Sequence, residues 1–140
     1  LTDHGYRIFV ITNQSGIGRG LYTEQTMHLI HATMLETIER SGGFIESIYY
    51  CPHHPDEMCE CRKPATGMLH RLREEKGVSL RGVPFVGDTM KDVKAALSIE
   101  AVPKLVLTGK GEREVAEVKK QYPEVEIFAD LLAVTEQILG

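Results

Sequence analysis

The sequence has no hydrophobic run near the roughly 18 residues that a membrane-spanning helix needs, and it has no signal-peptide pattern. It also has no excess of positive charge, because 16 basic residues stand against 20 acidic ones, for a formal charge of −4. This balance excludes the overall basic surface of a non-specific nucleic-acid binder. We therefore expect a cytoplasmic protein without a membrane or nucleic-acid partner, and we expect a monomer.

Cysteines are few, and their odd number does not suit a disulfide framework. All three lie in one short segment, which also contains His53 and His54, and Cys59 and Cys61 are too close in sequence for a relaxed disulfide. Thiolate and imidazole groups at this density predict a closed, tetrahedral, structural zinc site. Its ligands would be Cys51, His53, Cys59 and Cys61. Free thiols are the alternative interpretation.

Segments with the patterns of strands and helices alternate along the chain. Strands are predicted at residues 7–11, 44–50, 83–86, 104–108 and 125–128. Helices are predicted just before Gly5, between Thr23 and Ser41, and at residues 66–76, 91–98, 112–121 and 130–139. This alternation indicates an α/β fold, a doubly wound, Rossmann-like parallel sheet with helices on both faces. The length suits a single domain at residues 1–140, and the short excursion at 51–63 leaves no large cap domain.

Polar, chemically active segments follow the first three predicted strands, at the edge where such sheets bind ligands. The first is the glycine-rich loop at residues 11–20, whose hydroxyl, amide and backbone N–H groups suit an anion. An ordinary polar turn would look similar. The second is the segment that ends in Arg62 and Lys63, two cations that can bind a phosphate, although a solvated charge pair is also compatible.

The third segment carries Asp88 and Asp92, two carboxylates four residues apart at a strand-to-helix junction. Both can lie on one side of the first helical turn. Hard oxygen ligands of this kind suit Mg²⁺, which takes one or two carboxylates and completes its shell with water and phosphate. The alternative is structural, with Asp88 capping the helix and Asp92 paired with a lysine.

Together these segments resemble the haloacid dehalogenase (HAD) superfamily of phosphatases. Thr12 and Asn13 are similar to its second motif, Lys63 to its third, and Asp88 with Asp92 to its fourth. The cysteine segment followed by Arg-Lys-Pro resembles, more narrowly, the heptose bisphosphate phosphatases of that superfamily. The resemblance covers nearly the whole chain. It implies removal of one phosphate from a sugar bisphosphate through an aspartyl-phosphate, with Mg²⁺ and Zn²⁺ bound.

The resemblance also implies roles for individual residues. The catalytic residues would be Thr12, Asn13 and Lys63, and the substrate-binding residues Gln14, Ser15 and Arg62. Thr12 would hydrogen-bond the transferring phosphoryl group, and Lys63 would balance charge between the nucleophile and the phosphate. Asp88 would bind Mg²⁺, and Asp92 would support that end of the site.

One motif of the superfamily is missing, the Asp-x-Asp that supplies the nucleophile and the general acid/base. Asp3 cannot replace it, because a strand of about 15 Å separates it from the end that carries Thr12. We therefore expect a domain that lacks its N-terminal strand and helix. A zinc-stabilised phosphate-ligand or partner-binding module without turnover is a second hypothesis. Among enzymes, a histidinol-phosphate phosphatase is the alternative, and the cysteines argue against a polynucleotide 3′-phosphatase.

Overall fold

The computed structural model describes residues 1–140 and divides them into two compact units. The first unit is Leu1–Arg62, and the second unit is Lys63–Gly140. Each unit has its own parallel sheet, of two strands in the first and three in the second. Parallel strands joined by helices confirm the predicted α/β class, and the strands form two hydrogen-bonded groups where the sequence pattern predicts one sheet.

The first unit is built on two parallel strands and one long helix. Its elements are the 3₁₀ turn η1 (Thr2–His4), β1 (Phe9–Asn13), α1 (Ser15–Gly18), α2 (Glu24–Arg40), β2 (Ser47–Cys51) and the 3₁₀ turn η2 (Pro55–Glu57). Asn13 and Cys51 are paired at the carboxyl ends of β1 and β2. The polar residues that follow both strands therefore leave the sheet at the same edge.

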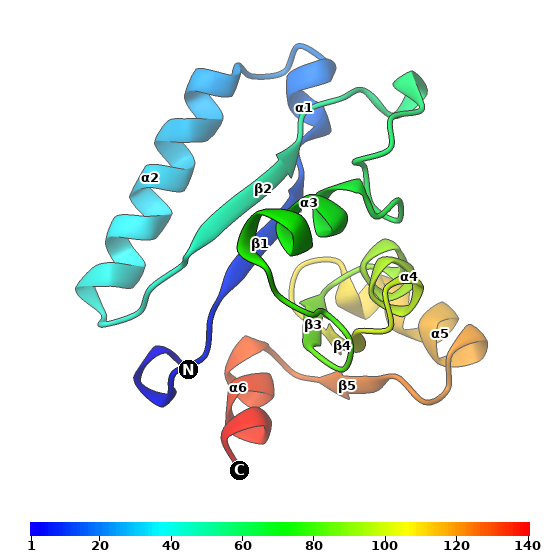
Figure 1. The fold of residues 1–140 in the computed structure, drawn as a ribbon. Coiled ribbons are helices and arrows are strands. Elements are labelled where there is room, and N and C mark those ends of the chain that lie inside the picture. Colours follow the sequence, from blue (N-terminus) through cyan, green and yellow to red (C-terminus); the bar gives the residue numbers. More distant parts are fainter. The chain divides into compact units, whose positions relative to one another are not determined.

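Helix α2 begins and ends where the sequence predicts. The Thr23 hydroxyl caps it by accepting a hydrogen bond from a backbone N–H of its first turn at 3.1 Å. Met27 of this helix is 1% exposed and belongs to the core. Helix α2 runs alongside β2 in Figure 1, and the ring of His28 packs edge-on against the ring of Tyr50.

The second unit alternates helices with three strands. Its elements are α3 (Gly67–Lys76), β3 (Pro84–Gly87), α4 (Met90–Ser98), β4 (Val102–Val106), α5 (Gly111–Gln121), β5 (Glu126–Phe128) and α6 (Leu131–Leu139). The strands are parallel, with β4 between β3 and β5. Helices α4, α5 and α6 each contact β4. The apolar faces of α4 and α5 and the strand form one core, with Val93, Leu105, Val118 and Val125 buried in it.

Several boundaries differ from the predicted ones, and β1 and β2 begin two and three residues later than expected. The segment before Gly5 is only a 3₁₀ turn, and residues 15–18 of the glycine-rich loop form the short helix α1. Strand β4 starts two residues earlier than predicted, because Val102 pairs with Pro84 of β3. The exact ends of helices and strands depend on contacts with neighbouring strands and loops, which local propensity does not predict.

Glu100 adopts a backbone conformation that usually favours glycine. Its φ is 59°, in the left-handed region that disfavours side chains with a Cβ atom. This turn therefore has a cost in backbone energy. It lies between α4 and β4 and carries none of the predicted site residues.

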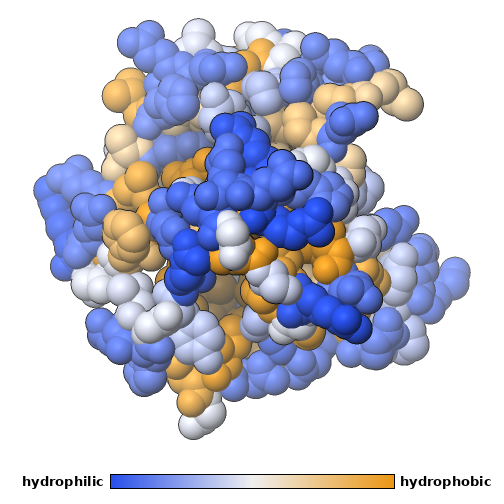
Figure 2. Space-filling view, in the orientation of Figure 1, coloured by the Kyte–Doolittle hydropathy of each residue, from blue (hydrophilic) through white to orange (hydrophobic).

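No helix of the chain is long and apolar enough to cross a membrane. On the face shown in Figure 2, hydrophobic residues are interspersed with hydrophilic ones. The large exposed hydrophobic side chains include Leu29 and Ile30 of α2, which are 66% and 60% exposed. Scattered exposure of this kind is normal for a folded chain.

Candidate functional site

The loop after β1 is held in place by a chain of hydrogen bonds between side chains. Nε2 of Gln14 donates a hydrogen bond to Oγ1 of Thr12 at 3.1 Å, and the Tyr22 hydroxyl donates to Oε1 of Gln14 at 2.5 Å. The Gln14 amide, predicted to bind substrate, is thus bonded at both ends and positions Thr12. Nothing in the local sequence pattern predicts this role of Tyr22. Gly16 leaves room for the Tyr22 ring, since a Cβ atom at Gly16 would overlap it.

The same loop packs on the segment that follows β2. The backbone N–H of Gln14 donates to the carbonyl oxygen of Cys51, and that of Gly18 donates to the carbonyl oxygen of Pro52, both at 2.8 Å. A Cβ atom at Gly18 would overlap the backbone of His54. The glycine-rich loop and the cysteine loop, residues 51–61, therefore share one backbone interface in the first unit, and Gly18 permits the close approach.

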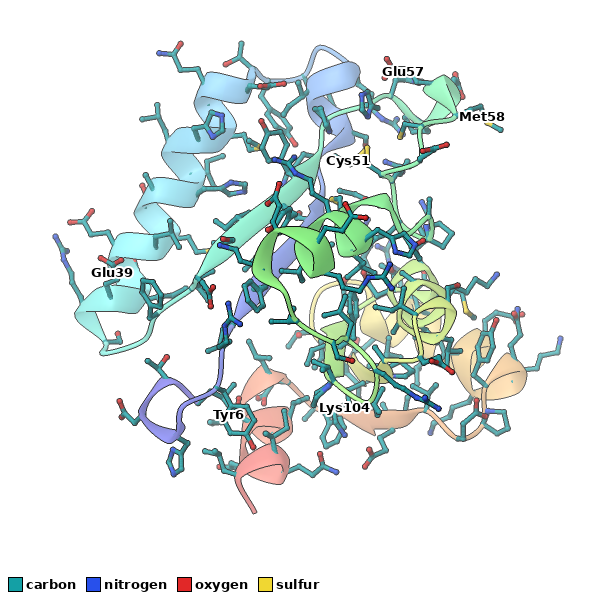
Figure 3. The ribbon with its side chains drawn as sticks, in the orientation of Figure 1. Tyr6, Glu39, Cys51, Glu57, Met58 and Lys104 are labelled. Carbon is teal, nitrogen blue, oxygen red and sulfur yellow. The ribbon has the colours of Figure 1, made fainter.

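The four predicted zinc ligands converge at the base of the cysteine loop. The atoms Cys51 Sγ, His53 Nδ1, Cys59 Sγ and Cys61 Sγ all lie within 4.8 Å of one another. The cysteines form no disulfide. Cys51 is buried at the end of β2, whereas Met58, at the outer end of the loop in Figure 3, is 88% exposed.

Three distances within this cluster are close to those between the ligands of a small tetrahedral ion, whereas Sγ of Cys61 lies nearer to Sγ of Cys51, at 2.8 Å. Sγ of Cys51 lies 3.4 Å from Nδ1 of His53 and 3.5 Å from Sγ of Cys59, and His53 Nδ1 lies 3.1 Å from Sγ of Cys61. Ligands at zinc bond lengths of about 2.0–2.3 Å, placed at tetrahedral corners, stand at comparable separations. Three sulfurs and one imidazole nitrogen are a donor set that suits Zn²⁺.

The thiols of the cluster have different proton affinities in the metal-free chain. Burial raises the pKa of Cys51. Burial, together with hydrogen bonds that favour the protonated thiol such as the one it donates to Cys51, raises the pKa of Cys61 to about 12. Burial also acts to raise the pKa of Cys59, but hydrogen bonds from the Cys51 thiol and the Arg62 backbone N–H outweigh it. The pKa of Cys59 is lowered to about 7. A bound cation would favour the thiolate form of all three.

Asp92 is the centre of a buried polar network in the second unit. It is 5% exposed, and its Oδ1 atom accepts a hydrogen bond from Nζ of Lys63 at 2.7 Å. Its Oδ2 atom accepts from the backbone N–H groups of Asp88 and Thr89 and from the Thr89 hydroxyl, at 3.2, 3.1 and 2.8 Å. Thr89 is the N-cap of α4, in a reciprocal capping box with Asp92. Of the two structural alternatives, only the pairing of Asp92 with a lysine occurs, and the lysine is the predicted catalytic one.

The side chain of Asp88 lies outside this network. Its Oδ2 atom accepts a hydrogen bond from the backbone N–H of Lys110 at 2.8 Å, and its Oδ1 atom has no hydrogen-bond partner. Asp88 does not cap α4, since Thr89 does. A partly exposed carboxylate with one unbonded oxygen, at the carboxyl end of β3, fits a Mg²⁺ ligand.

Arg62 ends the first unit and has an unusual guanidinium environment. Its Nη1 atom is buried and has no hydrogen-bond partner. A buried donor without an acceptor is destabilising, so this nitrogen suits an anionic acceptor. The predicted site residues therefore fall into two groups. Thr12, Asn13, Gln14, Ser15 and Arg62 belong to the first unit, and Lys63, Asp88 and Asp92 belong to the second.

Comparison with known proteins gives the family of this chain. Residues 60–134 match the HAD-hydrolase-like family model. The chain is 45% identical, over 99% of its length and 78% of the relative's, to the D-glycero-beta-D-manno-heptose-1,7-bisphosphate 7-phosphatase of Pseudomonas putida. The crystal structure of the B. bronchiseptica D,D-heptose 1,7-bisphosphate phosphatase, complexed with magnesium and phosphate, matches with a TM-score of 0.93 and 40% identity, over 99% of this chain and 77% of that one. The Burkholderia thailandensis enzyme matches with a TM-score of 0.77 and 32% identity, over 100% and 79%.

The chain is thus a member of the HAD-like hydrolases, and its class of reaction is that of a phosphomonoesterase. Within that class it belongs to the family of D-glycero-beta-D-manno-heptose-1,7-bisphosphate 7-phosphatases. The resemblance inferred from the motifs is confirmed at both levels.

Proposed function

We propose that the protein hydrolyses a phosphate ester of D-glycero-D-manno-heptose 1,7-bisphosphate in a Mg²⁺-dependent reaction, on the route to lipopolysaccharide heptose. The observation that carries the proposal is the pairing of Lys63 with buried Asp92, beside the carboxylate of Asp88 with its unbonded oxygen. A lysine held in this way presents a fixed positive charge, and the neighbouring carboxylate suits a divalent cation. The relatives favour this substrate over histidinol phosphate.

Each predicted residue has a defined task in this reaction. Lys63 neutralises charge as the phosphoryl group moves, and the Thr12 hydroxyl hydrogen-bonds one of its oxygens with Asn13 beside it. Asp88 holds Mg²⁺, which supplies further charge neutralisation at the phosphate. Arg62 uses its free Nη1 donor, and Ser15 its hydroxyl, to contact the remainder of the substrate. Asp92 supports the site by orienting Lys63 rather than by binding metal directly.

The covalent chemistry needs one group more. In an aspartyl-phosphate mechanism a carboxylate attacks phosphorus, the bond from phosphorus to the sugar oxygen breaks, and that oxygen takes up a proton. Water then hydrolyses the aspartyl-phosphate and releases inorganic phosphate. The Asp-x-Asp motif for these steps is not found in residues 1–140. We place it in a segment N-terminal to them.

We further propose that Zn²⁺ fills the Cys51, His53, Cys59 and Cys61 cluster and has a structural role. The loop between these residues has little secondary structure of its own beyond the turn η2. Four bonds to one ion would fix its shape, and with it Arg62, the residue directly after the last ligand. Reduced thiols of this kind suit the reducing cytoplasm.

The test of the proposed function uses the full-length gene product and a set of phosphate esters. Phosphate release from the heptose 1,7-bisphosphate should exceed that from histidinol phosphate by about 100-fold or more in kcat/KM. ³¹P NMR of the product identifies which phosphate has left. Asp88→Asn should lower kcat by about 100-fold to 1,000-fold, because the site loses its anionic metal ligand.

The other hypotheses give different results in the same experiment. A histidinol-phosphate phosphatase would reverse the substrate ratio. A binding module without turnover would release no phosphate from any ester, and Asp88→Asn would leave its affinity for the bisphosphate nearly unchanged. Either result would overturn the proposal.

A further inference from the structure

The loop after β4 contacts the Asp88 carboxylate directly. Strands β3 and β4 are parallel neighbours, with Gly87 opposite Leu105, so the segments after them emerge at the same edge of the sheet. Asp88 is the first residue after β3, and the backbone N–H of Lys110 donates to its Oδ2 atom at 2.8 Å. All of these groups lie in the second unit.

Gly109 makes this contact possible in two ways. Its φ is +63°, in the left-handed region that favours glycine. A Cβ atom at this position would also overlap the Oδ2 atom of Asp88. The other left-handed glycines of the second unit do not combine these features. Gly77, with a φ of +61°, has nothing within 4 Å of its added Cβ atom.

The two oxygens of Asp88 therefore differ. Oδ2 is held by the N–H of Lys110 against the backbone of Gly109, and Oδ1 has no partner within the protein. The other nearby carboxylate, that of Asp92, is occupied by four donors, including Nζ of Lys63. Oδ1 of Asp88 is thus the one carboxylate oxygen of this turn that can bind a cation without losing a hydrogen bond.

We infer that Gly109 and the backbone N–H of Lys110 are positioning elements for the metal. They fix the rotation of the Asp88 carboxylate and leave Oδ1 as its metal-binding oxygen. This inference rests on the proposed function, in which Asp88 holds Mg²⁺. Neither residue would touch substrate or metal, since both act through Asp88, and the Lys110 side chain has no part in the arrangement.

The test compares variants in pairs, with Mn²⁺ as the probe. In the full-length protein, Mn²⁺ binding is measured by electron paramagnetic resonance and Mg²⁺ activation by kinetics. Gly109→Ala should weaken Mn²⁺ binding by about 10- to 100-fold and raise the Mg²⁺ concentration for half activation in parallel. Gly77→Ala has a comparable φ penalty without the overlap. It should lower the melting temperature by a few degrees and leave Mn²⁺ binding unchanged.

A second pair isolates the hydrogen bond. Lys110→Pro removes the N–H donor and should weaken Mn²⁺ binding, whereas Lys110→Ala keeps the donor and should bind Mn²⁺ normally. The inference is overturned if Gly109→Ala and Lys110→Pro bind Mn²⁺ like the parent protein, or if Lys110→Ala loses as much affinity as Lys110→Pro. A Gly109→Ala protein that fails to fold leaves the Lys110 pair to decide.

Asp88→Asn separates this inference from the proposed function. If Asp88→Asn weakens Mn²⁺ binding and the positioning variants do not, the inference alone fails. If Asp88→Asn binds Mn²⁺ like the parent, Asp88 is not the metal ligand, and the proposed function fails with the inference.

Discussion

The cysteine loop and the turn at residues 87–92 are both predicted to bind metal, but they are held in different ways. The turn lies between β3 and α4, and its central carboxylate, Asp92, is buried and accepts hydrogen bonds from Lys63, Asp88 and Thr89. The cysteine loop leaves β2 and contains only the 3₁₀ turn η2. Its ligands are held mainly by contacts with one another.

The difference shows two ways of preparing a metal site. The turn is preorganised by secondary structure and by a buried ion pair, so its geometry exists before an ion binds. The cysteine loop brings together thiols that share protons, and an ion would replace these contacts with stronger bonds. We therefore expect the loop to depend on its metal and the turn to depend on its buried charges.

The largest expected effect is a difference in zinc binding between variants of two adjacent histidines in the cysteine loop. His53→Ala removes a ligand and should lower zinc affinity by at least about 1,000-fold, or roughly 4 kcal/mol. His54→Ala should retain about one zinc per chain, since His54 lies outside the cluster, where its Nδ1 atom accepts a hydrogen bond from the Asp56 backbone. Zinc content and competition with a chelator measure both. Equal zinc loss in the two variants, or less than about half an equivalent in the parent, would contradict the metal site.

The next effect concerns the buried ion pair of the turn. Asp92→Ala leaves the Lys63 ammonium, whose side chain is only 12% exposed, without this partner, and it leaves Thr89 without its capping acceptor. The free energy of unfolding should fall by about 3–5 kcal/mol. Urea denaturation measures this loss. Glu36→Ala breaks the exposed pair with Arg40 and should cost less than about 1 kcal/mol, so similar losses in both variants would argue against a preorganised turn.

The smallest effect tests whether the cysteine loop depends on its neighbour as well as on metal. Gly18→Ala places a Cβ atom against the backbone of His54 and should cost about 1–3 kcal/mol. Amide hydrogen exchange in residues 51–61 should become faster, because the two loops are pushed apart. Gly20→Ala, at a φ of +73° with nothing within 4 Å, is strained without that overlap and should leave exchange in the loop unchanged. Faster exchange in both variants would show that general destabilisation is the cause.

Much of the fold follows from local patterns. The 17-residue helix α2 could be placed from Thr23 as its cap and from the spacing of its apolar residues, and Gly77 marks the end of α3 in a left-handed conformation. Helix α1 could not be predicted in the same way, because its glycines are poor helix formers. Its position depends on hydrogen bonds such as that from Gly18 to Pro52, which join segments far apart in sequence.

The candidate site was predictable as a set of residues but not as a set of interactions. The chemistry of Cys51, His53, Cys59 and Cys61 was sufficient to predict that they meet. The roles of Gln14 and Asp92 were less accessible, since each side chain is engaged by groups whose location depends on the folded backbone. Nothing in the local sequence indicates the contacts that Tyr22 and Gly109 make in the candidate site.

By itself, the sequence determined the α/β class, the density of metal ligands and the motifs that mark a HAD phosphatase, because residue type, period and spacing are local properties. Only the tertiary structure decided which polar groups of the site are engaged in hydrogen bonds and which have none. Parallel strands place the loops that follow them at one edge, and there a backbone N–H and a glycine from one loop determine which oxygen of Asp88 remains unbonded. Such a choice depends on contacts between distant segments, which no local pattern contains.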